Sequence, residues 1–112
     1  MPRTHKLEII EQPHDSLAPR SGRRTPVHKG DTVFIFPEKG ATVTDLKISF
    51  SGKVPFKDGK VAYNEELTVN AEHVPGGGES ANVYKFSCSM KKNGKPLHSD
   101  GGGEFEVLPG EG

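Results

Sequence analysis

Short runs in which apolar and polar residues alternate recur along the chain, whereas apolar residues at the spacing of one helix face are nearly absent. Because successive side chains of a β-strand lie on opposite faces, each such run predicts a strand with one buried face. The clearest run spans residues 82–90, whose apolar positions are Tyr84, Phe86, Cys88 and Met90. Further strands are predicted at residues 6–11, 31–36, 43–50, 54–56, 61–63, 65–71 and 104–108. Seven or eight short strands at this spacing predict an all-β fold, either a Greek-key β-sandwich or a small barrel.

Turn signals separate the predicted strands. Asn93-Gly94 is the strongest hairpin signal, because both residues tolerate the positive φ of a tight turn. Such a hairpin would place residues 84–92 beside residues 95–98. Residues 12–30 contain three prolines and a Ser-Gly pair, and they predict one long polar loop. The glycines at 76–78 and 101–103 predict flexible turns, since no helix start follows either triplet.

The inward faces of the predicted strands define the expected core. Its members are Leu7, Ile9, Val33, Ile35, Leu46, Ile48, Phe50, Leu67, Val69, Tyr84, Phe86, Cys88, Phe105 and Val107. The length of 112 residues fits a single domain over residues 1–112. Only 31% of the residues are hydrophobic, so this core is small. Association with a second copy would bury further surface, and a homo-oligomer is one expectation.

The charges balance overall but not along the chain. Lys and Arg number 15, as do Asp and Glu, which argues against a nucleic-acid partner because such binders carry a basic excess. Residues 1–30 nevertheless carry six basic residues against three acidic ones. Arg20, Arg23 and Arg24 cluster within the predicted loop, where they would bind an anion or an acidic protein partner through bidentate contacts. The alternative is a mobile loop whose charges are solvated.

Other features of the composition bear on location. The longest apolar run, Val33–Phe36, is far shorter than the roughly 20 residues of a membrane helix. The N-terminus lacks the pattern of a signal peptide, and a single cysteine forbids an internal disulfide framework. We therefore expect a cytoplasmic protein that has no membrane partner.

Two segments of the chain resemble cupredoxins. Residues 27–33 (VHKGDTV) place a Gly-Asp turn before a core strand, and residues 84–89 (YKFSCS) are similar to the aromatic-x-aromatic-x-Cys strand that enters the copper loop of that family. A glycine-containing loop and a final Val-rich strand follow, as in cupredoxins. The resemblance implies a cupredoxin-like sandwich over about residues 27–108. An immunoglobulin-like sandwich is the near alternative, since Tyr and Cys also recur in one of its strands.

The resemblance implies a copper site made of two His, a Cys and an axial Met, and this chain departs from that pattern. Residues 38–50 hold no His, and the first His after Cys88 is His98. The resemblance thus implies a scaffold whose standard copper centre is missing. An atypical site for copper, made of Cys88, Met90 and His98, is one alternative, because thiolate and thioether ligands suit Cu(I). Ordinary core packing of Cys88 and Met90 is the other. His73, ahead of a glycine-rich break, is expected to be exposed.

Motifs for catalysis are lacking. There is no Ser-His-Asp motif, phosphate-binding loop or dinucleotide fingerprint, and a Cys88–His98 pair has no group to orient it. We therefore expect a non-catalytic binding or self-assembly module without a cofactor, in which edge strands at residues 54–63 extend a sheet. A copper-binding or electron-transfer protein is the alternative, and a thiol enzyme is a third.

Overall fold

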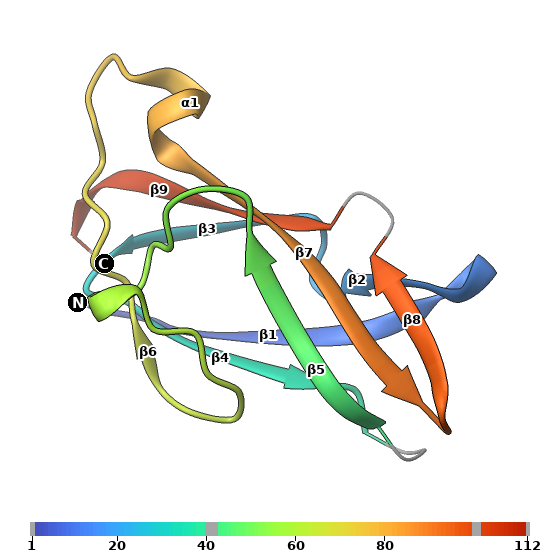
Figure 1. The fold of residues 1–112 in the computed structure, drawn as a ribbon. Coiled ribbons are helices and arrows are strands. Elements are labelled where there is room, and N and C mark those ends of the chain that lie inside the picture. The colour runs from blue at the N-terminus through green and yellow to red at the C-terminus, as the bar shows by residue number, and fades with distance from the viewer. Residues whose placement is uncertain (1, 40–42, 100–101, 112) are drawn as a thin grey trace.

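The computed structural model describes residues 2–39, 43–99 and 102–111, and this part of the chain forms nine strands. They are β1 (Thr4–Gln12), β2 (Ser16–Pro19), β3 (Arg24–Lys29), β4 (Thr32–Pro37), β5 (Val43–Phe50), β6 (Leu67–Thr68), β7 (Val83–Lys92), β8 (Lys95–Ser99) and β9 (Gly103–Glu111). Helical turns are the 3₁₀ segments η1 (Pro13–Asp15) and η2 (Lys57–Gly59) and the short helix α1 (Gly78–Asn82). The expected all-β, sandwich-like class is confirmed, with nine strands in place of seven or eight (Figure 1). None of the described helices could cross a membrane.

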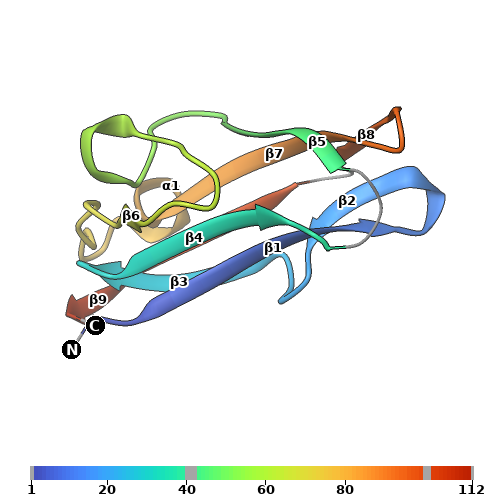
Figure 2. The same ribbon diagram turned by 90° about the horizontal axis from the view of Figure 1, so that it is seen from below.

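Strand β7 organises one layer. Its first half pairs with β9 and its second half with β8, while β5 pairs along its other edge, all antiparallel. In the other layer β1 pairs in parallel with β4 and antiparallel with β2. A parallel β2–β8 pairing joins the layers, so the strands form one mixed sheet that folds over itself (Figure 2). The Greek-key connection and the likeness to cupredoxins stay predictions.

The core between the layers is mainly the predicted one. Every predicted core residue is buried except Phe50 and Tyr84, which are partly buried at its margin. Phe50, Phe56, Phe86 and Phe105 form an aromatic cluster with ring centroids 5.4 to 6.2 Å apart. Leu17, Val27, Phe56 and Leu97 are buried core residues that the alternation did not include, and Met90, which it placed on the same face as Cys88, is buried in the core as well.

The hairpin prediction at Asn93-Gly94 is confirmed. Asn93 has a φ of 52° and Gly94 a φ of 81°, and Lys92 pairs with Lys95 across the turn. The positive φ at both central positions is the geometry that lets a two-residue turn follow the twist of its strands.

The prediction of one long loop at residues 12–30 is wrong. This segment contains η1, β2 and β3, with Leu17 and Val27 fully buried. Strand β3 pairs in parallel with β9, which lies about 80 residues later in the chain. Strands β2 and β3 each carry a single large apolar residue, so alternation does not reveal them. Strand β2 pairs with its neighbour β1 and with the distant β8, and β3 pairs with the distant β9.

The segment between β5 and β7 also differs from the prediction. Residues 61–63 form no strand, Phe56 makes only an isolated bridge with Val69, and β6 is two residues long. The segment instead joins the two layers: Ile48 N–H donates to the Tyr63 hydroxyl (2.7 Å), and Asn64 N–H donates to the Ile35 carbonyl (2.8 Å). Helix α1 begins at Gly78, where no helix start was predicted. The other glycine triplet, 101–103, lies partly outside the described residues.

A buried carboxylate, that of Asp31, connects several elements at one end of the sandwich. Its side chain is fully buried and accepts hydrogen bonds from the Arg3 N–H (3.0 Å), the His28 N–H (3.0 Å) and His5 Nε2 (2.8 Å). The Asp31 backbone N–H donates to the His28 carbonyl, and its carbonyl accepts from the Val69 N–H. Burial alone raises the pKa of Asp31, but these hydrogen bonds outweigh it, so that its pKa lies below the ordinary 3.8. Asp31 is therefore ionised in the folded protein at neutral pH.

We predict that Asp31→Asn lowers the free energy of unfolding at neutral pH by about 1–3 kcal/mol, because an amide group would turn a donor toward one of the backbone N–H groups. The sign of the pH dependence follows from the lowered pKa: Asp31 adds stability above pH 3.8 that is lost as the pH falls through its folded pKa. Urea unfolding from pH 7 to pH 2 should thus show a flatter acid limb for the variant.

Asp58→Asn is the matched control, since Asp58 is exposed and forms no ion pair among the described residues. Equal stability of the Asp31 and Asp58 variants would contradict the role given to the Asp31 carboxylate.

Candidate functional site

The structure does not bring Cys88, Met90 and His98 together as a ligand set. Cys88 and Met90 are buried on the inner face of β7. Ser89, which lies between them on β7, is on the outer face, and it pairs with His98. Residues opposite one another in an antiparallel pair lie on the same face, so His98 is also on the outer face, where it is exposed. In the described part of the chain no group of three or more His, Cys, Asp or Glu side chains could hold a metal ion. Copper binding at these residues therefore remains a prediction that the strand geometry does not favour.

The Cys88 thiol is in the environment of a structural cysteine. Burial raises its pKa to about 12, and its side chain packs in the core with Met90 and Phe86. A thiolate is the reactive form of cysteine, so this thiol is poorly suited to nucleophilic or metal chemistry at neutral pH.

The arginines expected to bind an anion are bonded to acids of the same chain. Arg20 pairs with Glu8 (2.7 Å), Arg24 with Glu79 (2.7 Å) and with Glu104, and Arg23 lies 3.6 Å from Glu104. The hydrogen bonds that Arg20 donates to Glu8 raise the pKa of Arg20, and those that Arg24 donates to Glu79 and Glu104 raise the pKa of Arg24. These side chains are on the surface, yet their charges are largely compensated.

His73, expected to be exposed, is partly buried. Its Nδ1 lies 3.0 Å from the Val107 carbonyl, which places a proton on Nδ1 and attaches the loop before α1 to β9. The role of His73 is therefore structural in this arrangement.

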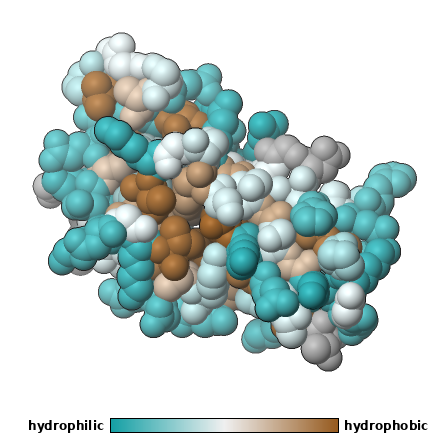
Figure 3. All heavy atoms as spheres, in the orientation of Figure 1, coloured by the Kyte–Doolittle hydropathy of each residue, from teal (hydrophilic) through white to brown (hydrophobic). Residues whose placement is uncertain are grey.

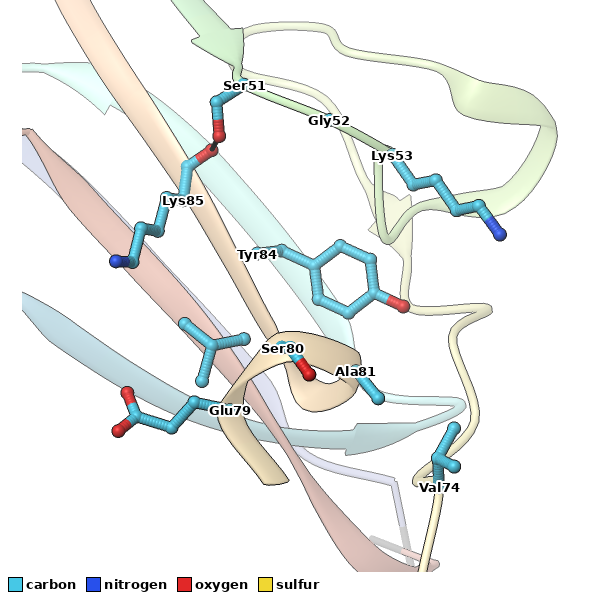
Figure 4. A pocket seen from close by; sticks show the side chains of 10 residues that line it. Ser51, Gly52, Lys53, Val74, Glu79, Ser80, Ala81, Tyr84 and Lys85 are labelled. Atoms are coloured by element: carbon cyan, nitrogen blue, oxygen red, sulfur yellow. Dashed lines mark hydrogen bonds between the residues drawn. The ribbon is translucent and has the colours of Figure 1, made fainter. Parts of the chain in front are cut away.

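A groove of about 630 Å³ lies where the inner face of β7 reaches the surface. We call it the Tyr84 groove; its lining residues are Ser51, Gly52, Lys53, Val74, Glu79, Ser80, Ala81, Val83, Tyr84 and Lys85. Figure 4 shows the Tyr84 ring in the middle, with α1 on one side and the 51–53 segment on the other. In the space-filling view, apolar atoms reach this face of the molecule near α1 and are surrounded by hydrophilic side chains (Figure 3).

Strand alternation and one buried amide position this groove. Tyr84 is the first residue of the inward stripe that continues with Phe86 and Cys88, so its ring lies at the mouth of the sandwich. The buried Asn82 side chain donates to the Val74 and Gly78 carbonyls (both 3.0 Å) and accepts from the Val74 N–H (2.7 Å). The Asn82 amide therefore holds the Val74 loop against α1 and fixes one wall of the groove.

The charges of the groove are mostly positive. Lys53 and Lys85 are exposed on either side of the Tyr84 ring and form no ion pair with any described residue (Figure 4). Glu79, the acid of the lining, is engaged by Arg24. The Tyr84 hydroxyl has no hydrogen-bond partner among the described residues and is open to solvent. Such a site offers an apolar ring, a free hydroxyl and two cations to a ligand.

Sequence reasoning placed Tyr84 in the core and did not identify this groove. Its position at the end of an inward stripe, next to a glycine-rich segment, was the available signal. The contribution of Asn82 carried no signal in the sequence, because it depends on the fold of the 74–82 segment. Comparisons with known protein families, with curated proteins and with solved structures found no match to this chain.

We predict that the Cys88 thiol of the native protein reacts with iodoacetamide far more slowly than it does in urea, because the thiolate is both scarce and buried. Mass spectrometry of quenched samples measures the rates. The matched control is Ser87→Cys in a Cys88→Ala background, since Ser87 is exposed on the opposite face of β7. If native Cys88 were alkylated as fast as the introduced thiol, the structural role of Cys88 would be refuted.

Proposed function

We propose that this chain is a non-catalytic binding module that works without a cofactor, and that the Tyr84 groove binds a short acidic protein segment carrying an apolar side chain. The observation that carries the proposal is the half-buried Tyr84 ring, with its free hydroxyl, between two lysines that have no acidic partner among the described residues. Partly buried aromatic residues with a polar tip are common anchors of binding surfaces.

Charge complementarity favours an acidic ligand. A carboxylate beside Lys53 or Lys85 would gain a charge-assisted contact, while the Tyr84 ring, Val74 and Ala81 would cover an apolar side chain. Val74 is the most exposed large hydrophobic residue of the described chain, at 46% exposure, and its burial by a ligand would be favourable. A groove of about 630 Å³ is within the size range of ligand sites.

The sequence analysis also allowed for self-assembly by sheet extension, and the strand edges argue against it. On β5, Asp45 has a φ of 57° within a register shift, and Tyr63 occupies the Ile48 N–H. On β3, Pro26 lacks an N–H, and β6 is only two residues long. Bulges, prolines and short strands are the usual devices that prevent edge pairing. A homo-oligomer formed through another surface remains a prediction.

The test is fluorescence polarisation with a labelled Asp-Glu-Leu-Glu-Asp peptide at low ionic strength, with Lys-Arg-Leu-Arg-Lys as the charge-reversed peptide. We expect the acidic peptide to bind better, and Tyr84→Ala to weaken its binding about tenfold, which corresponds to about 1.4 kcal/mol. Lys53→Glu and Lys85→Glu should each weaken binding as well, whereas Tyr84→Phe, which keeps the ring, should weaken it less than Tyr84→Ala.

Lys57→Glu is the charge-matched control, because Lys57 lies in η2 outside the groove and forms no ion pair among the described residues. Equal binding of both peptides, or an equal loss in the Lys57 and Lys85 variants, would refute the proposal. Circular dichroism of each variant separates lost binding from lost folding.

A further inference from the structure

A second groove, of about 430 Å³, lies between β1 and β3. We call it the β1–β3 groove; its lining residues are Arg3, Thr4, His5, Lys6, Ser21, Arg24, Thr25, Pro26, His28 and Leu108. Strand β1 pairs with β2 and β4, and β3 pairs with β9, while no pairing in the described chain joins β1 to β3. The groove therefore lies where the sheet folds over itself without closing. Figure 2 shows the course of the strands.

The edge of β3 that borders the groove is poorly suited to accept another strand. The Glu104 N–H donates to the Arg23 carbonyl, so the backbone groups of Arg23 point toward β9. Backbone groups of alternate strand residues point to the same edge, and those of Arg24, Pro26 and His28 therefore point toward the groove. Pro26 has no N–H, and both backbone groups of His28 are bonded to Asp31. An extended chain would find few backbone partners here, which favours recognition by side chains.

The ionisable side chains that line the groove are all basic. Three are permanent cations and two are histidines, and no Asp or Glu is among them. The charge of Arg24 is compensated, by Glu79, Glu104 and the more distant Glu106. Arg3 and Lys6 are exposed and form no ion pair with the described residues.

The two histidines are held by Asp31, the charged group beneath them. His5 Nε2 lies 2.8 Å and His28 Nδ1 3.9 Å from the same oxygen of Asp31. Because the carboxylate is ionised, neutral His5 keeps its proton on Nε2, and its Nδ1 is an acceptor. Protonation turns that Nδ1 into a donor and adds a positive charge to the groove.

We infer that the β1–β3 groove binds an oxyanion of the sulfate or phosphate type through Arg3, Lys6 and the two histidines. A metal cation fits the same residues poorly. Both Asp31 oxygens already accept hydrogen bonds, and the neighbouring Arg3, Lys6 and Arg24 would repel a cation.

The test is titration of the ¹⁵N-labelled protein with inorganic sulfate, monitored by NMR. We expect shifts of the Thr4, His5, Thr25 and His28 amide signals that saturate as sulfate is added, because these residues line the groove. A second titration uses glucose 6-sulfate, which is a sulfate ester. Tighter binding of glucose 6-sulfate than of inorganic sulfate would show that the groove recognises an ester, and equal binding would show that it recognises the free ion.

Variants assign the effect to the groove. Arg3→Gln with Lys6→Gln should abolish the shifts, and His28→Gln should reduce them; Lys57→Gln is the matched control for a lost surface charge. Amide spectra of each variant show whether the fold is kept. Shifts scattered over the surface, or unchanged binding in the Arg3–Lys6 variant, would each overturn the inference. Failure of peptide binding at the Tyr84 groove would leave it untouched, because the two lining sets share no residue.

Discussion

The ionised carboxylate of Asp31, buried at one end of the sandwich, is the interaction on which the first half of the chain depends. Desolvation of this group is unfavourable, and three hydrogen bonds compensate it, two from backbone amides and one from the His5 ring. The donors come from the start of β1 and the end of β3, and the Asp31 backbone is bonded to Val69. Strands β1 and β3, which do not pair with each other, are therefore connected through the Asp31 side chain. Loss of any of its hydrogen-bond donors would leave the buried charge less well compensated.

This way of connecting strands explains why the molecule has grooves at its surface. Asp31 positions β1 and β3 at one point only, so their edges remain apart and the β1–β3 groove lies between them. At the mouth of the sandwich the inward stripe of β7 continues to Tyr84, beyond the closely packed aromatic cluster. Arg24 lies between the two grooves and bonds Glu79 of α1, which attaches a wall of one groove to the strand that lines the other.

Local patterns predicted the strands whose alternation is regular, such as β5 and β7, and the Asn93-Gly94 turn. They failed for β3, which pairs with β9 far away in the sequence, and for β2, which carries one large apolar residue and pairs both with its neighbour β1 and with the distant β8. The copper hypothesis could have been weakened from the sequence alone. A two-residue turn at Asn93-Gly94 pairs Lys92 with Lys95 and therefore Ser89 with His98, which puts His98 on the face opposite Cys88. The hydrogen bonds of Asp31 could not be foreseen, because Arg3 and His5 lie 28 and 26 residues before it.

The distribution of ion pairs changes how the charges of this chain should be interpreted. The dense arginine cluster at residues 20–24 was the most conspicuous basic feature of the sequence, yet Glu8, Glu79 and Glu104 compensate it within the fold. The cations without an acidic partner among the described residues include Arg3, Lys6, Lys53 and Lys85, which are isolated in the sequence and line the two grooves. A run of basic residues therefore indicates a binding site only if acidic residues of the same chain do not form ion pairs with it. A neutral protein can therefore present basic sites wherever the fold separates a cation from every carboxylate.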